Sequence, residues 1–234
     1  MIVSIHQPNY IPWLGFFHKL LLSDTYVVFD DVQFPRGKDY ANRNQIKTNN
    51  GKMWLTASVL GKKDLKPWNQ IKINDNGWRE KHLKNIKSFY QKSPYFDTYY
   101  PLIEYIYQQN QKLLIELNLD LILFFLTILG KDINIVTSSS IKTELAGLDK
   151  ILYILKDQKA TRYISGDGEG SKRYIDEKLF KDNNIELIWQ NYKHPVYNQL
   201  HGEFIPYLSI LDLIFNEGPN SKNVIISEDL KTKM

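Results

Sequence analysis

A chain of 234 residues, of which 43% are hydrophobic and 24% charged, is long enough for a well-buried core and too apolar for a disordered protein. The absence of cysteine excludes thiol catalysis, cysteine-ligated zinc and a disulfide framework. The formal net charge of +4 comes from dispersed lysines and arginines, which favours an anionic small molecule over nucleic acid as the partner. An apolar strand pattern begins directly after Met1, without a basic and apolar leader, so we expect a cytoplasmic protein.

The first part of the chain predicts the order strand, loop, helix, strand. The apolar run from Ile2 to Ile5 is typical of a buried strand, and a polar segment that contains prolines follows it. Pro12 suits the start of a helix from Trp13 to Leu22, and the aromatic and β-branched run from Tyr26 to Phe29 predicts a second strand. In a parallel sheet the loops after these two strands share one edge, where open α/β sheets bind their ligands.

The middle of the chain predicts a small β flap and then helices. Met53 to Leu60 and Gln70 to Ile73 are typical of an antiparallel pair, which gives a flap at about residues 53–73 beside the site. Three helical patterns follow, at Trp78 to Lys92, Tyr95 to Gln108 and Leu113 to Leu129. We interpret them as a helical insertion at about residues 78–130. The third pattern is shorter than the roughly 20 residues of a membrane span and contains charged residues, so we expect a buried helix or one that forms a homo-oligomer.

The last part of the chain alternates strands and helices. Strands are predicted at Ile133 to Thr137, Arg162 to Ser165 and Glu186 to Trp189. Helices are predicted between them at Leu148 to Lys156 and Ser171 to Asn183. This alternation predicts an α/β fold with a three-layer, mainly parallel, Rossmann-like sheet of about five strands. We expect residues 1–234 to form a single α/β domain.

The most specific motif is H-Q-P-x-Y-x-P-W-x-G-F-x-x-K, which runs from His6 to Lys19. Together with further short segments it resembles the WbqC-like protein family. Those segments are Asp30, Gln33, Asn42 to Lys47, Trp54, Ser165-Gly166, Tyr192, His194-Pro195 and Asp212-Leu213. The resemblance implies a protein of bacterial surface-polysaccharide biosynthesis, with O-antigen and lipopolysaccharide as the products, and a glycine transferase role is suggested for the family.

The organisation of the opening unit is also similar to that of nucleotidyltransferase-type folds. In those folds a glycine early in the first helix belongs to an H-x-G-H motif. Here Trp13-Leu14-Gly15-Phe16 stands at that place, so both histidines of the motif are absent. The fold organisation can be shared, but the residues for adenylyl transfer are not carried over.

We predict three catalytic candidates at the edge of the sheet. His6 follows the first strand, where an imidazole can act as general base or hold an anion, and the alternative is a hydrogen-bonded core histidine. His194 follows the last strand, and the alternative is a histidine in a surface loop. Asp30 ends the second strand and could hold Mg²⁺ or a ribose hydroxyl or accept a proton. No recognisable spacing of metal ligands accompanies it, so we predict no metal site.

The predicted substrate-binding residues are of four kinds. Amides and hydroxyls are expected to orient the ligand: Gln7, Asn9, Tyr10, Gln33, Asn42, Asn44 and Ser165. Cations are expected to bind a pyrophosphate, or else to be solvated surface: Lys19, Arg43 and Lys47. Trp13 could stack on a base or sugar ring, or pack in the core. Gly166 opens a glycine-rich loop that could cradle an anion, but an ordinary strand-to-helix turn has the same composition.

The resemblance to the WbqC-like family motivates the hypothesis of a transferase that moves an aminoacyl group, glycyl in the first instance, onto the amine of a nucleotide-linked amino sugar. The polar, basic and aromatic residues of the sheet edge make this reaction chemically possible. No serine has visible triad partners, so we expect direct attack by the substrate amine. The activated amino acid would be an adenylate made with ATP and Mg²⁺, or a charged tRNA. The alternatives are a non-catalytic nucleotide-sugar-binding or scaffold protein of the polysaccharide assembly pathway and, ranked last, an RNA-binding protein with strongly salt-dependent affinity.

Overall fold

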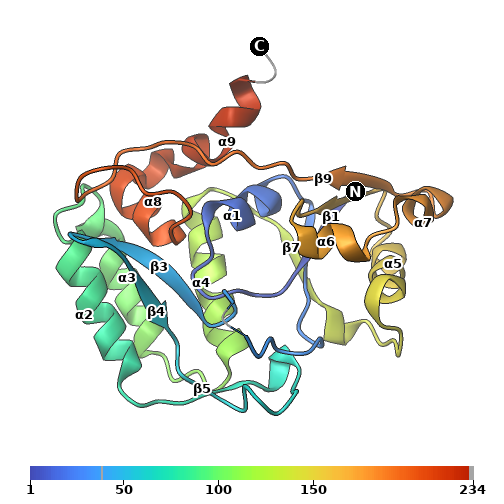
Figure 1. Ribbon diagram of the computed structural model, residues 1–234, viewed down its shortest axis with the longest axis horizontal. Coiled ribbons are helices and arrows are strands. Elements are labelled where there is room, and N and C mark those ends of the chain that lie inside the picture. Colours follow the sequence, from blue (N-terminus) through green and yellow to red (C-terminus); the bar gives the residue numbers. More distant parts are fainter. Residues whose placement is uncertain (38, 232–234) are drawn as a thin grey trace.

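The computed structural model in Figure 1 describes residues 1–37 and 39–231. Its centre is a sheet of five parallel strands in the order β7, β2, β1, β8, β9. The strands are β1 (Ile2–His6), β2 (Thr25–Val28), β7 (Asn134–Thr137), β8 (Arg162–Ser165) and β9 (Glu186–Trp189). The predicted α/β class with a Rossmann-like parallel sheet of about five strands is therefore confirmed.

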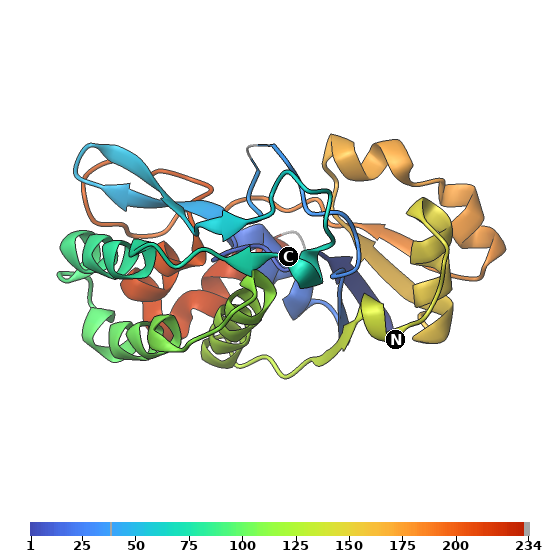
Figure 2. The ribbon, with the colours of Figure 1, turned by 90° about the horizontal axis from the view of Figure 1, so that it is seen from below.

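The central strands separate two hydrophobic cores, because successive side chains of a strand face opposite sides of a sheet. Val3 and Ile5 belong to the smaller core, and Tyr26 and Val28 belong to the larger one. Figure 2 shows the covering helices on opposite sides of the sheet, which gives three layers. The covering helices are α1 (Leu14–Leu21), α4 (Leu114–Ile128) and α8 (Ile210–Glu217) on one side, and α5 (Gly147–Asp157), α6 (Glu169–Tyr174) and α7 (Glu177–Asp182) on the other.

The direction in which the sheet grows reverses at β1. This strand pairs with β2 on one side and with β8 on the other. The chain first builds outward through β2 and β7, and then returns to add β8 and β9. At such a reversal the connections leave two neighbouring strands towards opposite faces, and a crevice opens at the carboxyl ends of those strands. The ends of β1 and β8 are therefore the expected place for a ligand.

Between β2 and β7 the chain forms two antiparallel pairs, and here the structure differs from the prediction. β3 (Arg43–Thr48) pairs with β4 (Gly51–Thr56), and β5 (Val59–Leu60) pairs with β6 (Lys72–Ile73). The single strand predicted from Met53 to Leu60 is thus divided between two pairs. The polar sequence of β3 gives no strand signal, because side chains such as that of Lys47 are buried against partners far away in the chain.

The helices of the middle segment lie close to their predicted bounds. α2 (Trp78–Tyr90) packs on α3 (Phe96–Gln108), which packs on α4. None of the helices in the described residues is both long and apolar enough to cross a membrane. Short 3₁₀ helices are found at η1 (Trp68–Gln70), η2 (Ser138–Ser140) and η3 (Gly218–Asn220). That the chain is one domain with a helical insertion and a β flap stays a prediction.

The helix predicted from Ser171 to Asn183 is two helices, α6 and α7. Asp176 lies between them and accepts a hydrogen bond from the Lys178 N–H (2.9 Å). This is the geometry of an N-cap, which satisfies a free N–H group at a helix start. Asp176 is therefore the N-cap of α7, which separates this helix from α6.

The segment after β9 runs back across the protein and contacts first α1 and then β3. Beside α1, Gln190 Nε2 donates to the Gly15 carbonyl (2.6 Å). Near β3, the Lys47 ammonium donates to the Glu203 carbonyl (2.5 Å). The chain then forms α8, and α9 (Ser221–Lys231) packs against α1. The last part of the sequence thus completes the larger core (Figure 1).

Asp212 of α8 is a buried carboxylate that connects three segments. Its oxygens accept hydrogen bonds from the hydroxyls of Tyr90 and Tyr197, each at 2.9 Å. The Tyr90 hydroxyl in turn accepts from the Lys47 N–H (2.9 Å). Burial raises the pKa of Asp212 to about 6, although the two tyrosine hydrogen bonds act in the opposite direction. Burial of the charged carboxylate is therefore unfavourable, and the hydrogen bonds from Tyr90 and Tyr197 offset part of this effect.

We predict that Asp212→Ala lowers the free energy of unfolding by about 2–4 kcal/mol, because two buried hydroxyls lose their acceptor. Asp212→Asn should cost less, since the amide oxygen still accepts one hydrogen bond and the shape is kept. Urea unfolding at neutral pH measures both variants. Equal losses would show that the lost hydrogen bonds do not account for the destabilisation.

Candidate functional site

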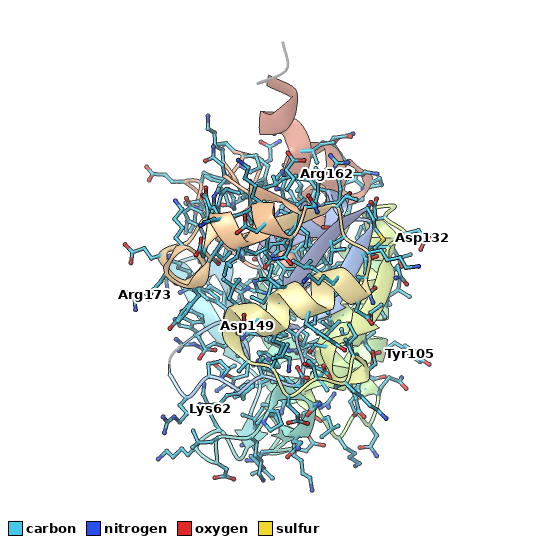
Figure 3. The ribbon with its side chains drawn as sticks, turned by 90° about the vertical axis from the view of Figure 1, so that its right-hand side faces the viewer. Lys62, Tyr105, Asp132, Asp149, Arg162 and Arg173 are labelled. Carbon is cyan, nitrogen blue, oxygen red and sulfur yellow. The ribbon has the colours of Figure 1, made fainter. Side chains whose placement is uncertain are left out.

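A pocket of about 430 Å³ lies at the carboxyl edge of the sheet, where the strand order reverses. The predicted residues His6, Gln7 and Ser165 line it, together with Phe29 and Tyr163. Helices α5 and α6 also contribute to its walls. Figure 3 shows α5, which carries Asp149, in front of the central strands, and Arg173 of α6 at the left of the view. The pocket thus occupies the place where open α/β sheets bind ligands.

His6 is the last residue of β1 and is half-buried. Its Nδ1 lies 2.8 Å from the Gln7 carbonyl oxygen, and because a carbonyl only accepts, Nδ1 carries the proton. Nε2 therefore presents a lone pair. The Phe16 ring packs edge-on against the imidazole (5.1 Å between centroids). Burial lowers the pKa of His6 to about 3 and the charge of Lys19 acts in the same direction, so the imidazole is neutral at neutral pH.

Lys19 of α1 is a buried cation without a counter-ion. Its side chain is only 4% exposed, and its ammonium has no hydrogen bond or ion pair within the described residues. Burial lowers its pKa to about 7. Helical side chains lean towards the helix N-terminus, so this one extends towards the carboxyl edge of the sheet, where its charge acts on His6. An uncompensated buried ammonium is costly, and an anion beside it would lower that cost.

The polar edge continues from β8 to β9. The hydroxyl of Ser165 donates to the Gly166 carbonyl (3.3 Å), at the start of the turn into α6. A second hollow of about 570 Å³ adjoins the pocket, and Ile175 lines both. Lys172 and Trp189 lie in this second hollow and offer a cation and an aromatic face. The two hollows together follow the sheet edge around α6.

Asp30 is buried, and its carboxylate is fully engaged. It accepts hydrogen bonds from the hydroxyls of Ser138 and Ser139, the Ser139 N–H and the Asn69 amide at 2.6–3.3 Å. These contacts tie the end of β2 to η2 after β7. No group of three His, Asp or Glu side chains in the described chain could hold a metal ion. The hydrogen bonds of Asp30 indicate a structural role, in which its carboxylate connects the end of β2 to η2.

Tyr10 lies inside the protein, away from the pocket. It is fully buried, and its hydroxyl forms hydrogen bonds with His82 Nδ1 (2.8 Å) and the Tyr107 hydroxyl. Asn9 is half-buried in the same loop, and its N–H donates to the Gln7 carbonyl (2.9 Å). Tyr10 thus anchors the loop after β1 to the helices α2 and α3.

Two asparagines support the same loop through its backbone. Asn44 donates to the Ile11 carbonyl (2.8 Å), and Asn118 donates to the Pro8 carbonyl (2.6 Å). Ile11 has a φ of 36°, a left-handed conformation that is unfavourable for a β-branched residue. The predicted ligand-binding residue Asn44 therefore holds a strained turn in place.

The other predicted residues of the hairpin region do not line the pocket. The Arg43 guanidinium stacks on the Trp54 ring at 4.1 Å and donates to the Asp39 carbonyl. The amide of Asn42 donates to the Ala57 carbonyl (2.7 Å). The remaining two are Lys47, whose ammonium is bound to carbonyls of the C-terminal segment, and Gln33, which is exposed.

Trp13 and His194 come together in an aromatic cluster at the start of α1. Their rings stack at 6.4 Å with an interplanar angle of 11°, and Tyr207 packs against both. His194 Nδ1–H donates to the Pro195 carbonyl (2.8 Å), and Nε2 accepts from the Tyr207 N–H (3.1 Å). Burial lowers the pKa of this imidazole. Both nitrogens are thus occupied, and the pocket beside His6 does not include this cluster.

Sequence reasoning missed part of the pocket wall. Phe29 and Tyr163 fit the apolar strand pattern and give no separate signal. Tyr174 lies on a helix whose bounds depend on the cap at Asp176. Ile151 of α5 also lines the pocket, and it could not be placed there from its neighbours in sequence.

The strand order and the pocket at its reversal define a doubly wound α/β protein. Residues 7–224, nearly the whole chain, match the WbqC-like protein family, and the chain belongs to this family. It is also similar to the uncharacterized protein Rv1507c of Mycobacterium tuberculosis (strain ATCC 25618 / H37Rv), with 29% identity over 226 residues, 95% of this chain and 96% of the relative. No solved structure matches the chain at a significant level.

Gly15 lies against the Trp13 ring, and a Cβ at this position would be 2.3 Å from the indole Cη2. We predict that Gly15→Ala displaces the indole, breaks its stack on His194 and lowers the free energy of unfolding by about 1–3 kcal/mol. Near-ultraviolet circular dichroism and urea unfolding measure the two effects. Gly37→Ala is the control, because a Cβ there meets nothing within 4 Å. A Gly15→Ala protein with the wild-type spectrum would contradict the expectation.

We also predict that Lys19→Met raises the free energy of unfolding of the ligand-free protein by a few kcal/mol below pH 7, because it removes a buried, unpaired charge. The unfolded chain keeps the lysine proton up to its ordinary pKa of 10.5, whereas the folded chain releases it at about 7. Between these values the unfolded state binds more protons, so the stability of the wild type rises with pH. The advantage of Lys19→Met should therefore shrink as pH rises.

Urea unfolding at about pH 6 and about pH 9 tests this expectation. Lys84→Met, which removes an exposed lysine of α2, is the matched control and should change stability little at either pH. A Lys19→Met protein that is less stable than the wild type at the lower pH would contradict the interpretation of Lys19 as an uncompensated charge.

Proposed function

We propose that this protein is a transferase of bacterial surface-polysaccharide (O-antigen) biosynthesis, which binds a nucleotide-linked amino sugar at the edge of the sheet and transfers an aminoacyl group, glycyl in the first instance, to the sugar amine. One observation carries the proposal. The pocket at the strand reversal contains a neutral His6 whose Nε2 presents a lone pair, and the charge of the buried Lys19, which is not among the residues that line the pocket, acts on His6. Such a site suits a ligand with an anionic part and a nucleophilic nitrogen.

The proposed binding uses charge and hydrogen bonds in different parts of the edge. Lys19 would attract a phosphate group of the nucleotide, because burial strengthens the interaction between opposite charges. Gln7 and Ser165 line the pocket and would hydrogen-bond to sugar hydroxyls. Trp189, in the adjoining hollow, offers an aromatic face for the base, and Lys172 a second cation. The two hollows give room for the two halves of a nucleotide sugar.

The acyl transfer is a direct displacement. The sugar amine attacks the carbonyl carbon of the activated amino acid, a new N–C bond forms, and the bond from that carbon to the leaving oxygen breaks. The attacking amine gives up one proton, which His6 Nε2 would accept. A phosphate beside Lys19 would offset the charge that lowers the pKa of His6, so ligand binding itself would make His6 a stronger base.

The amino acid can arrive in activated form by two routes. As an adenylate it would require ATP with Mg²⁺, and as an ester of a charged tRNA it would require neither. The carboxylate of Asp30 has its hydrogen-bonding capacity taken up by Ser138, Ser139 and Asn69, so it does not fit a magnesium ligand. This favours an acyl donor that is activated before it binds.

One observation favours the alternative of a non-catalytic nucleotide-sugar-binding or scaffold protein in the assembly pathway. With a pKa of about 3, His6 is a weak base in the ligand-free protein. The alternative predicts the same ligand and the same contribution from Lys19, but no acylated product.

We predict that a nucleotide-linked amino sugar raises the melting temperature of the wild type, by the equivalent of about 2.7 kcal/mol at a hundredfold excess over its dissociation constant. The shift should be lost in Lys19→Met, although that variant is itself more stable without ligand. A thermal-shift panel with the amino sugar nucleotide, its non-aminated counterpart, ATP with Mg²⁺ and free glycine measures this. Lys84→Met should respond like the wild type.

Mass spectrometry of the amino sugar nucleotide after incubation with glycyl-tRNA, or with glycine, ATP and Mg²⁺, separates the two functions. An acylated product that disappears in His6→Phe supports the transferase. Binding without product under both conditions supports the scaffold protein. Stabilisation by none of the nucleotide sugars would overturn both.

A further inference from the structure

A second groove, which shares no residue with the pocket at the sheet edge, lies between β4 and α2. Its volume is about 650 Å³, enough for a sugar ring with its substituents. Trp54 and Thr56 line it from β4, and Ser58 from the segment that follows. Trp78, Lys81 and Asn85 line it from α2. Indoles, hydroxyls, a side-chain amide and one cation thus face a common space.

Trp54 is held as a rigid platform although it lies on the surface. Its side chain is 38% exposed, which is unusual for a residue of this size. The Arg43 guanidinium stacks on the ring at 4.1 Å, and Arg43 Nε donates to the Asp39 carbonyl (3.0 Å). Tyr40 also contacts the ring (5.7 Å between centroids). An indole fixed in this way and left partly open can bind the apolar C–H face of a sugar ring with little loss of conformational entropy.

Trp78 supplies an unsatisfied donor at the same groove. Its side chain is 6% exposed and packs edge-on against Tyr10 and His82. The indole Nε1–H has no hydrogen-bond partner within the described residues. Buried polar groups normally have a partner, so this one points to an acceptor that the chain does not supply. The nitrogen is closed to solvent, so a sugar hydroxyl in the groove would reach it after a small shift of the indole.

The charge of the groove favours an acidic ligand. Lys81 is exposed at its rim, and no carboxylate of the described chain lines the groove. Burial lowers the pKa of His82 to about 4, so this residue adds no charge at neutral pH. The groove therefore combines neutral hydrogen-bonding groups with one cation. A carboxylate on the sugar would pair with Lys81 while the ring rests on Trp54.

We propose that the groove between β4 and α2 is a binding site for a saccharide unit that carries a carboxylate. Trp54 stacks on the ring, Trp78 and Asn85 hydrogen-bond to hydroxyls, and Lys81 pairs with the carboxylate. The site binds without catalysing a reaction. It is independent of the pocket at the sheet edge and of the transferase activity proposed there, so the protein would hold a saccharide at one place and a nucleotide sugar at another.

The five tryptophans allow a direct test, because each gives one indole N–H signal in a proton–nitrogen correlation spectrum. Glucuronate is the probe and glucose its uncharged counterpart. We predict that glucuronate shifts the signals of Trp54 and Trp78 in a saturable way and leaves those of Trp13, Trp68 and Trp189 in place. Trp54→Ala should abolish the shift at Trp78. Lys81→Gln should weaken glucuronate binding about tenfold, the usual effect of losing one charged hydrogen bond.

Tyr105→Ala is the control for loss of an exposed aromatic residue. Tyr105 lies on α3, is 64% exposed and projects at the edge of the view in Figure 3. This variant should bind glucuronate like the wild type. The proposal is overturned if glucuronate produces no saturable shift, if glucose binds equally well, or if Trp54→Ala and Lys81→Gln both bind normally. Shifts confined to Trp13 or Trp189 would place the sugar elsewhere and would overturn it too.

Discussion

The loop between β1 and α1 is the constraint on which the rest of the structure depends. It must turn the chain out of the central strand while much of its backbone is buried, and buried carbonyls need donors. Asn44 and Asn118 provide them from a hairpin and a helix that lie far away in the sequence. Tyr10 adds a side-chain anchor among the helices. The sheet and the helical part are therefore joined by hydrogen bonds to one short loop, which brings Gln7 to the pocket directly after His6, the last residue of β1.

The electrostatics of the sheet edge follow from the same arrangement. α1 begins right after this loop and brings Lys19 back towards the end of β1, where burial withdraws solvent from both Lys19 and His6. Within the part of the chain that the structure describes, neither group pairs with a carboxylate, since Asp30 is engaged by serines and Asp31 is paired with Lys150. The carboxylates of Asp30 and Asp31 are thus occupied by structural contacts. The positive charge of Lys19 is therefore available to an anionic ligand.

The sequence predicted best those elements whose local hydrophobic pattern matches their burial in the folded protein. The inner strands β1, β2 and β8 are short, largely apolar and mostly buried, and the edge strands β7 and β9 are partly buried, so the apolar pattern survives folding. β3 is different, because Asn44 and Lys47 are buried polar residues whose partners come from other parts of the chain. No local pattern can reveal such a strand. The break between α6 and α7 depends on a single cap at Asp176, which a helical pattern conceals.

The candidate site was predictable to a similar extent. Residues at strand ends, such as His6 and Ser165, meet because parallel strands share their carboxyl edge. Whether Arg43 or Trp13 joins them depends on where the hairpin and the C-terminal segment pack, which residue spacing does not encode. The burial of Lys19 without a counter-ion is likewise a tertiary property.

The returning C-terminal segment has a consequence for the order of events during synthesis. The central strand β1 emerges first, yet its neighbour β8 follows only after about two thirds of the chain, and the carbonyls that bind Lys47 emerge later still. Until then one edge of β1 has no partner strand, and the part of α3 that packs on α8 is uncovered. The nascent chain therefore exposes apolar surface and an unpaired strand edge, both of which are prone to aggregation, until the rest of the chain has been synthesised. We expect ribosome-associated chaperones to bind it during this time. Removing α8 and α9 from the finished chain would uncover the residues of the larger core that pack on them.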